Sequence, residues 1–248
     1  MKIRAGLFIT AAVLIAVSTA NAGMTLTATI RDFKDSHPDF EGPHAGVETG
    51  IVKNTLGADG KPVWNGAYSI VSVSSESSFN QWYRDVDGIN MKTTFDLNLT
   101  ETSPGIYSYQ DSSFFPIDGQ LFGNEGRSHN YHFTMELHNK FTYQGGETFD
   151  FRGDADLFVF INDKLVIDIG GVHGPTSASV NLDTLGLTQG QSYDFDLFFA
   201  ERHTTGSNFL MDTSIELEPQ STIPAPGALL LGGIGFAAVR IVRRRRNG

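Results

Sequence analysis

The sequence predicts an all-β sandwich or barrel with long loops. Runs with strand character recur along the chain and are separated by Gly, Asn, Asp, Ser and Pro. Several runs alternate apolar and polar residues with a period of two, as residues 25–30 and 193–198 do. Amphipathic helical stretches are scarce. Many short strands with irregular connections favour a sandwich or barrel over other fold classes.

The chain begins with a segment typical of a secretory signal peptide, residues 1–22. Lys2 and Arg4 give it a basic start, an apolar stretch follows, and Ala20-Asn21-Ala22 forms a small-x-small cleavage pattern. The apolar stretch is shorter than the roughly 20 residues that a membrane span needs. We therefore expect cleavage after Ala22 and export, with a permanent anchor as the alternative.

The body of the chain, residues 23–222, contains the predicted strands. These are residues 24–30, 68–74, 91–99, 131–137, 149–151, 157–161, 164–169, 192–200 and 208–217. A helix is expected near residues 79–86, where serines precede the segment as caps. Residues 36–66 are irregular and rich in Gly, Pro and His, and we expect them to form long surface loops.

The clearest local signal is a β-hairpin in residues 159–168. Two apolar runs flank Asn162-Asp163, and both residue types tolerate left-handed backbone conformations. The hairpin explains Asp163 as a turn residue. It does not explain Asp154 and Asp156, which stand just before the first run.

The charge of the body limits its partners. Its 11 basic and 28 acidic residues give a net charge near −17. Such a surface repels nucleic acid and anionic lipid, but it is compatible with divalent cations and neutral sugars. The chain has no cysteine, so an exported body must be held by a hydrophobic core, and about 200 residues can build one as a single domain.

The last segment, residues 223–248, has the composition of a sorting tag. An apolar stretch, residues 227–239, ends in Arg240 and then in the arginines of residues 243–246. If Arg240 snorkels, a thin membrane-spanning helix is possible with the arginines on the cytoplasmic side. The alternative is a buried C-terminal helix.

This segment resembles the PEP-CTERM sorting signals of Gram-negative envelope proteins, with Pro224-Ala225-Pro226 as the motif. Ala225 replaces the usual acidic residue. The resemblance implies that an exosortase-type enzyme recognises and cleaves the chain. It also implies a cell-envelope or extracellular location, with an inner-membrane anchor before processing.

The body resembles the fibro-slime domain, a bacterial relative of the PA14 β-barrel module. Blocks spread over about residues 27–217 carry the likeness. They are Thr29-Ile30-Arg31-Asp32-Phe33, Phe114-Phe115-Pro116-Ile117-Asp118, His129-Asn130-Tyr131-His132-Phe133, Phe151-Arg152-Gly153-Asp154, Gly170-Gly171-Val172-His173-Gly174 and Phe199-Ala200-Glu201-Arg202-His203. The resemblance implies a PA14-like β-sandwich or barrel.

PA14-like adhesin modules bind carbohydrate at the end of the barrel, often through Ca²⁺ held by two adjacent aspartates. The resemblance places Asp154 at the first aspartate and Ala155 at the second, so that Asp156 would substitute. With Asp168, these aspartates are the candidate metal ligands, because Ca²⁺ prefers several converging oxygens. The alternative is that Asp154 and Asp156 only cap a turn.

Polar residues at strand ends are the candidates for ligand binding. Glu201, Arg202 and His203 follow an apolar strand, and His173 lies where the chain turns sharply. They would recognise sugar hydroxyls, while Trp64 or Trp82 stacks on the sugar ring. The structural alternative is a salt bridge and a hydrogen-bond network that fix the loops.

Together these features predict an exported, non-enzymatic module for adhesion or for binding carbohydrate, including exopolysaccharide. No Gly-x-Ser-x-Gly elbow, phosphate loop or His-Glu-x-x-His motif is present. Two alternatives remain open. One is a self-associating matrix or biofilm protein, and the other is a glycoside hydrolase that uses an Asp and Glu pair.

Overall fold

The computed structural model describes residues 23–67 and 69–218, and ten strands in this part of the chain form one sheet. The strand order is β7-β6-β9-β4-β1-β2-β3-β10-β5-β8. The elements are β1 (Gly23–Phe33), α1 (Glu76–Phe79), β2 (Asn90–Ser103), β3 (Ile106–Asp111), β4 (Phe133–Thr142), β5 (Thr148–Gly153), β6 (Asp156–Ile161), β7 (Lys164–Ile169), β8 (Thr176–Asn181), the 3₁₀ helix η1 (Leu182–Leu185), β9 (Ser192–Glu201) and β10 (Phe209–Thr213). The predicted all-β fold class is confirmed.

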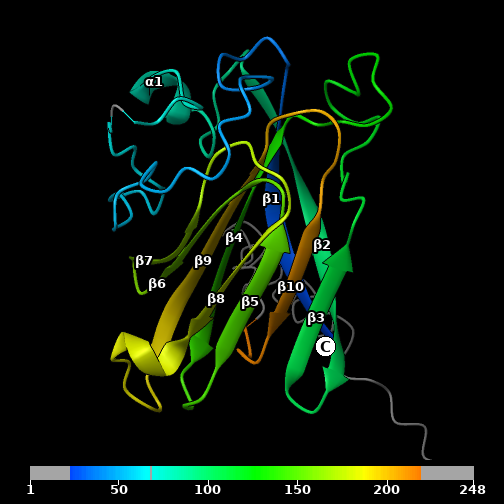
Figure 1. The fold of residues 1–248 in the computed structure, drawn as a ribbon. Coiled ribbons are helices and arrows are strands. Elements are labelled where there is room, and N and C mark those ends of the chain that lie inside the picture. Colours follow the sequence, from blue (N-terminus) through cyan, green and yellow to red (C-terminus); the bar gives the residue numbers. More distant parts are fainter. Residues whose placement is uncertain (1–22, 68, 219–248) are drawn as a thin grey trace, which may run out of the picture.

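The sheet curls until its two halves face each other, with β9, β4 and β1 behind β8, β5 and β10 in Figure 1. The edge strands β7 and β8 contact one another, so the barrel is nearly closed. An inner core of buried side chains from both halves fills it, including Leu26, Leu97, Met135, Phe149, Leu157, Phe195, Phe199 and Phe209. This core holds a chain without cysteine together by apolar burial.

Strand β6 is buried on both faces, which explains its continuous apolar run. Leu157, Val159 and Ile161 point into the inner core. Phe158 and Phe160 point outward into a second cluster, the outer core. The residues of the outer core are Ile51, Val52, Val73, Phe79, Trp82, Tyr83, Phe158, Phe160, Phe198 and Ala200.

The outer core is covered by a long irregular segment, here called the cover (residues 36–67 and 69–86). The prediction of surface loops for residues 36–66 is therefore wrong in part. Ile51 and Val52 are fully buried, and isolated bridges join Glu48 to Gly170 and Thr55 to Lys164. The strand predicted for residues 68–74 is also wrong, because residues 69–74 contain no strand. Their polar backbone groups bond to side chains instead, as when Val71 N donates to Glu48.

The predicted helix is displaced toward the N-terminus and is only one turn long. Ser75 caps α1 and forms a capping box with Ser78, as the preceding serines suggested. The helix ends at Phe79 instead of extending to residue 86. The Asn90 side-chain amide donates to Gln81 O and Arg84 O at 3.0 and 2.9 Å, so these carbonyls bond outside any helix.

Strand prediction succeeded where the apolar pattern was strong. The hairpin is confirmed as β6 and β7, and Asn162 and Asp163 have φ values of 51° and 62°, as a type I′ turn needs. Strands β3 and β8 were not predicted. The sequence of β8, TSASVN, is small and polar, so it lacks the apolar alternation that marks a strand.

A buried charge network clamps the cover to the outer face of the sheet. The Glu136 carboxylate accepts hydrogen bonds from Arg31 Nη1 at 2.9 Å and from Lys61 Nζ at 2.5 Å. His138 Nδ1 bonds to Asp196 at 2.6 Å. The pKa of Glu136 falls to about 2 because hydrogen bonds and nearby cations outweigh its burial. The pKa of His138 rises to about 9 because Asp196 and Glu136 stabilise its cation more than burial disfavours it.

The barrel has two distinct ends, here called the rim and the base. The loops that follow β5, β7 and β9 lie at the rim, with α1 and much of the cover at the top of Figure 1. The described ends of the chain lie toward the base. Gly23 begins β1 there, and Glu218 bridges to Lys140, about 24 Å along β4 from the rim residue Phe133.

The signal and sorting segments predicted at residues 1–22 and 223–248, including the C-terminal apolar helix, lie outside the described residues. In the described part of the chain, no helix is long and apolar enough to cross a membrane. The division of the chain into these three parts stays a prediction.

Candidate functional site

A pocket of ≈ 180 Å³ opens at the rim, between the loops that follow β5, β7 and β9. Six of the seven candidate residues line it: Asp154, Asp156, His173, Glu201, Arg202 and His203. Asp168 does not. The six residues are up to about 50 positions apart in the chain, and they meet because the strands that carry them end at the rim of the sheet.

The sheet register brings these loops together. Asp156 pairs with Ala200 on β9, so the residues before β6 face those after β9. Gly171 has φ +94°, and a Cβ there would lie 2.3 Å from Gly46 O. Only glycine fits this approach, which lets Gly46 N donate to Val172 O at 3.0 Å. The same approach brings His44 of the cover into the pocket wall.

Asp156 and Arg202 form a fully buried ion pair. Arg202 Nε and Nη2 donate to the two oxygens of Asp156 at 2.7 and 2.9 Å, and Gly171 N also donates to Asp156 at 2.6 Å. The remaining guanidinium donors reach Asp39 O, Ser72 O and Ser72 Oγ. All five N–H groups are thus used. Arg202, held in place by Asp156, thus joins the barrel to the cover, which is the structural role left open as the alternative.

Trp82 cannot stack on a sugar, contrary to the expectation for it. Its side chain is 0% exposed in the outer core, and the Arg202 guanidinium lies over its ring at 4.5 Å. Its Nε1 donates to Asp39 at 2.9 Å. Trp64 packs against the outer core and is partly buried. Neither Trp64 nor Trp82 lines the rim pocket.

Asp154 connects two rim loops. Its carboxylate accepts hydrogen bonds from Asn208 N at 2.6 Å and from Asn208 Nδ2 at 2.5 Å. Asn208 stands just before β10, so these bonds tie the start of β6 to another strand and do not merely cap a local turn. Asn208 was not singled out from the sequence.

Glu201 is the most unusual carboxyl group of the pocket. It is 3% exposed, and burial raises its pKa well above the usual value, with the neighbouring Asp154 charge adding to the shift and the Ser207 hydroxyl opposing it. Oε1 accepts a long bond from His203 N at 3.4 Å. Oε2 and Ser207 Oγ are both buried without a hydrogen bond of normal geometry. Burial therefore favours the protonated acid.

Three histidines share the pocket wall. His173 is 8% exposed; its Nδ1 bonds to Gly174 O at 2.8 Å, and its Nε2 is buried without a partner. Because a carbonyl only accepts, Nδ1 carries the proton and a neutral ring leaves Nε2 as an acceptor. His203 bonds to Thr204 O at 2.7 Å, and its ring centroid is 4.0 Å from that of His44.

The three aspartates do not fit the predicted Ca²⁺ site. Both oxygens of Asp156 bind Arg202, a cation, and those of Asp154 bind Asn208. Asp168 Oδ2 accepts from Gly50 N at 2.6 Å, away from the pocket, and burial raises its pKa. In the described residues, no group of three or more His, Asp or Glu side chains is arranged to hold a metal. Calcium binding stays a prediction, and these three aspartates do not supply its ligands.

His44 is a titratable residue of the pocket wall that sequence reasoning missed. It lies in the irregular residues 36–66, where no periodic pattern indicates which side chains turn inward. The glycines of residues 170–171 were a usable signal, because a backbone without Cβ often marks close approach by another segment.

Residues 108–224 match the family model of the PA14 domain. Two curated relatives, psiQ and psiD of Dictyostelium discoideum, are 43% and 44% identical to it over 195 and 208 residues. These alignments cover 72% and 77% of this chain but 20% and 41% of the relatives. The chain thus spans less than half the length of these relatives. The narrower fibro-slime assignment stays a prediction.

Solved structures of three proteins are also similar. The PA14 domain of the antifreeze protein MpAFP has a TM-score of 0.34 at 12% identity, covering 85% of this chain and 90% of that one. The epithelial adhesin 9 A domain from Candida glabrata, in complex with Galb1-4GlcNAc, has 0.30 at 15%, covering 78% and 83%. The PA14 sugar-binding domain of an RTX adhesin has 0.28 at 15%, covering 36% and 52%.

Proposed function

We propose that this chain, which matches the PA14 domain model over residues 108–224, is a non-enzymatic carbohydrate-binding module of an exported protein and acts in adhesion or exopolysaccharide binding. The rim pocket is its binding site. The observation that carries this proposal is a pair of buried polar atoms without a hydrogen bond of normal geometry, His173 Nε2 and Glu201 Oε2, in residues that line one pocket.

Unsatisfied buried polar atoms cost free energy, so their presence in one wall favours a ligand that supplies the missing bonds. His173 Nε2 accepts a hydrogen bond, and a protonated Glu201 donates one. A sugar hydroxyl does both at once. The pocket is smaller than the roughly 300 Å³ of ordinary small-molecule sites, which favours one terminal sugar over a longer segment of chain.

The position of the pocket suits display. It opens at the rim, whereas Gly23 and Glu218 lie toward the base. A tether at either described end would therefore turn the pocket away from the point of attachment. This supports the adhesion role together with the proposed envelope location.

The test is a glycan array with the full chain, followed by calorimetric titration of the strongest glycan. His173→Leu removes the Nε2 acceptor at similar size, and we expect affinity to fall about 10-fold or more. Asp87→Asn, which removes an exposed carboxylate outside the pocket, is the control and should leave affinity unchanged. No binding to any glycan, or equal loss in both variants, would contradict the proposal.

The same preparation distinguishes the alternatives. A matrix protein would assemble with rising concentration and without sugar. A hydrolase would release reducing ends, and Glu201→Gln would abolish the release. Titration with and without Ca²⁺ tests calcium separately.

We also propose export through residues 1–22, followed by membrane insertion and exosortase-type cleavage of residues 223–248. The intact mass of the mature protein from a Gram-negative host tests both steps. A mass equal to that of the full sequence would contradict them.

A further inference from the structure

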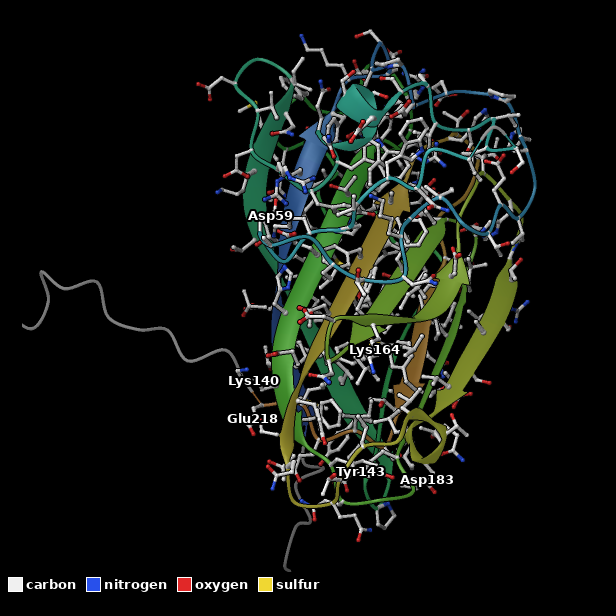
Figure 2. All side chains as sticks on the ribbon, turned by 90° about the vertical axis from the view of Figure 1, so that its left-hand side faces the viewer. Asp59, Lys140, Tyr143, Lys164, Asp183 and Glu218 are labelled. Atoms are coloured by element: carbon white, nitrogen blue, oxygen red, sulfur yellow. The ribbon has the colours of Figure 1, made fainter. Side chains whose placement is uncertain are left out.

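A second hollow, of ≈ 450 Å³, opens at the base, far from the rim pocket. It is lined by residues 142 and 144–147, around the β4–β5 turn, and by residues 214 and 216–218. Figure 2 shows Lys140 beside Glu218, and Tyr143 beside Asp183 at the lower end of the barrel. Gly145 and Gly146 have φ values of +95° and +87°, and a Cβ on Gly146 would meet no atom within 4 Å, so the turn leaves open space.

Glu147 is the group in this hollow that points to a ligand. The residue is 7% exposed, and its Oε1 accepts a hydrogen bond from Gln144 N at 2.5 Å. Its Oε2 is buried without a partner. A buried carboxylate oxygen that lacks a donor is costly, and nothing in the rim site uses it.

The surrounding charge is negative. Glu216 and Glu218 also line the hollow and are exposed. The nearby cation, Lys140, is paired with Asp194, although its charge also acts on Glu218. Asp183 is already occupied, because it accepts bonds from Gly146 N and Tyr143 OH, both at 2.6 Å. A cation is therefore favoured here.

An organic cation suits this hollow better than a metal ion. The carboxylates of the hollow are not among any group arranged to hold a metal in the described residues. An N–H donor on a slim stem would reach Glu147 Oε2, and Leu217 provides an apolar wall for the stem. Guanidinium and ammonium groups have this form and make the stronger, charge-assisted bonds to carboxylates.

We infer that the base hollow binds one alkylguanidinium or alkylammonium group, such as an arginine or lysine side chain presents. Glu147 accepts its hydrogen bond, and Glu216 and Glu218 attract its charge. This inference is independent of the proposed function, because it concerns the opposite end of the barrel and other residues.

Ligand-detected NMR titration of the full chain with n-butylguanidinium tests the inference, with n-butylammonium as a second probe and n-butylurea as the neutral isostere. We expect both cations to bind saturably with a Kd of about 1 mM, and n-butylurea not to bind. Glu147→Gln should weaken binding about 10- to 100-fold, whereas Asp87→Asn, an exposed carboxylate outside the hollow, should not.

Glu216→Gln keeps the inference testable if Glu147→Gln fails to fold, since Glu216 is exposed. The Glu216→Gln variant should bind the cation more weakly, and the affinity that remains should depend less on salt concentration. No saturable binding, equal binding of the urea, or equal affinity in all variants would overturn the inference. Glycan binding at the rim is a separate readout, so the two proposals fail independently.

Discussion

Removal of the Asp156 carboxylate is the sharpest test of how the rim is built. Asp156→Ala removes a carboxylate that accepts three hydrogen bonds, two from Arg202 and one from Gly171 N. Arg202 is 2% exposed, so its charge stays buried beside Trp82 without a counterion. Breaking a buried pair in this way typically costs about 3–5 kcal/mol. For a domain of this size we expect Tm to fall by roughly 6–20 °C.

The assay is equilibrium unfolding in urea together with a thermal scan, read by Trp fluorescence because Trp82 lies under the Arg202 guanidinium. Asp87→Ala is the matched control: it removes an exposed carboxylate and should change the free energy of unfolding by less than about 0.5 kcal/mol. The double variant Asp156→Leu with Arg202→Met should recover part of the loss, because it leaves no buried charge. A loss below about 1 kcal/mol in Asp156→Ala would refute the assignment of Asp156 as the counterion that holds Arg202 between the barrel and the cover.

Two further changes test other parts of the fold. Raising the pH should reduce stability, because the His138 pKa of about 9 exceeds the ordinary histidine value of 6.5; the stability that His138 contributes is complete below about 6.5 and is lost as pH rises through about 9. Glu136, with a pKa of about 2, has the opposite effect, because the stability that it contributes is lost as pH falls from about 4.5 through 2. The free energy of unfolding measured across pH should fall at both the acid and the alkaline end. His138→Gln should reduce the fall at alkaline pH, and an unchanged alkaline slope would contradict the role of His138. Gly171→Ala should destabilise by about 1–3 kcal/mol, since a Cβ at φ +94° would lie 2.3 Å from Gly46 O, whereas Gly174→Ala, where a Cβ meets no atom within 4 Å, should be nearly neutral in the same urea assay.

The sequence predicted the barrel wherever a local pattern reflected burial. The run of β6 and the Asn162-Asp163 turn are specified by apolar residues and by backbone conformation, and both were found. The rim residues were found because polar side chains at the ends of apolar strands converge at one edge of a sheet.

The cover could not be predicted, because its structure depends on distant partners. Ile51 and Val52 are buried in the outer core with outward-facing residues of β6 and β9, which their own neighbourhood does not encode. The role of Arg202 likewise depends on Ser72 and Asp39, more than 100 residues away. The same long-range bonds explain why Asp156, which resembled a metal ligand in sequence, is bonded to a guanidinium in the fold.

The most direct test of the proposed function is a crystal structure of the chain with the best glycan from the array. The prediction is a sugar ring in the rim pocket, with one hydroxyl within hydrogen-bond distance of both His173 Nε2 and Glu201 Oε2. A sugar bound elsewhere on the barrel, with both atoms still unpartnered, would contradict it.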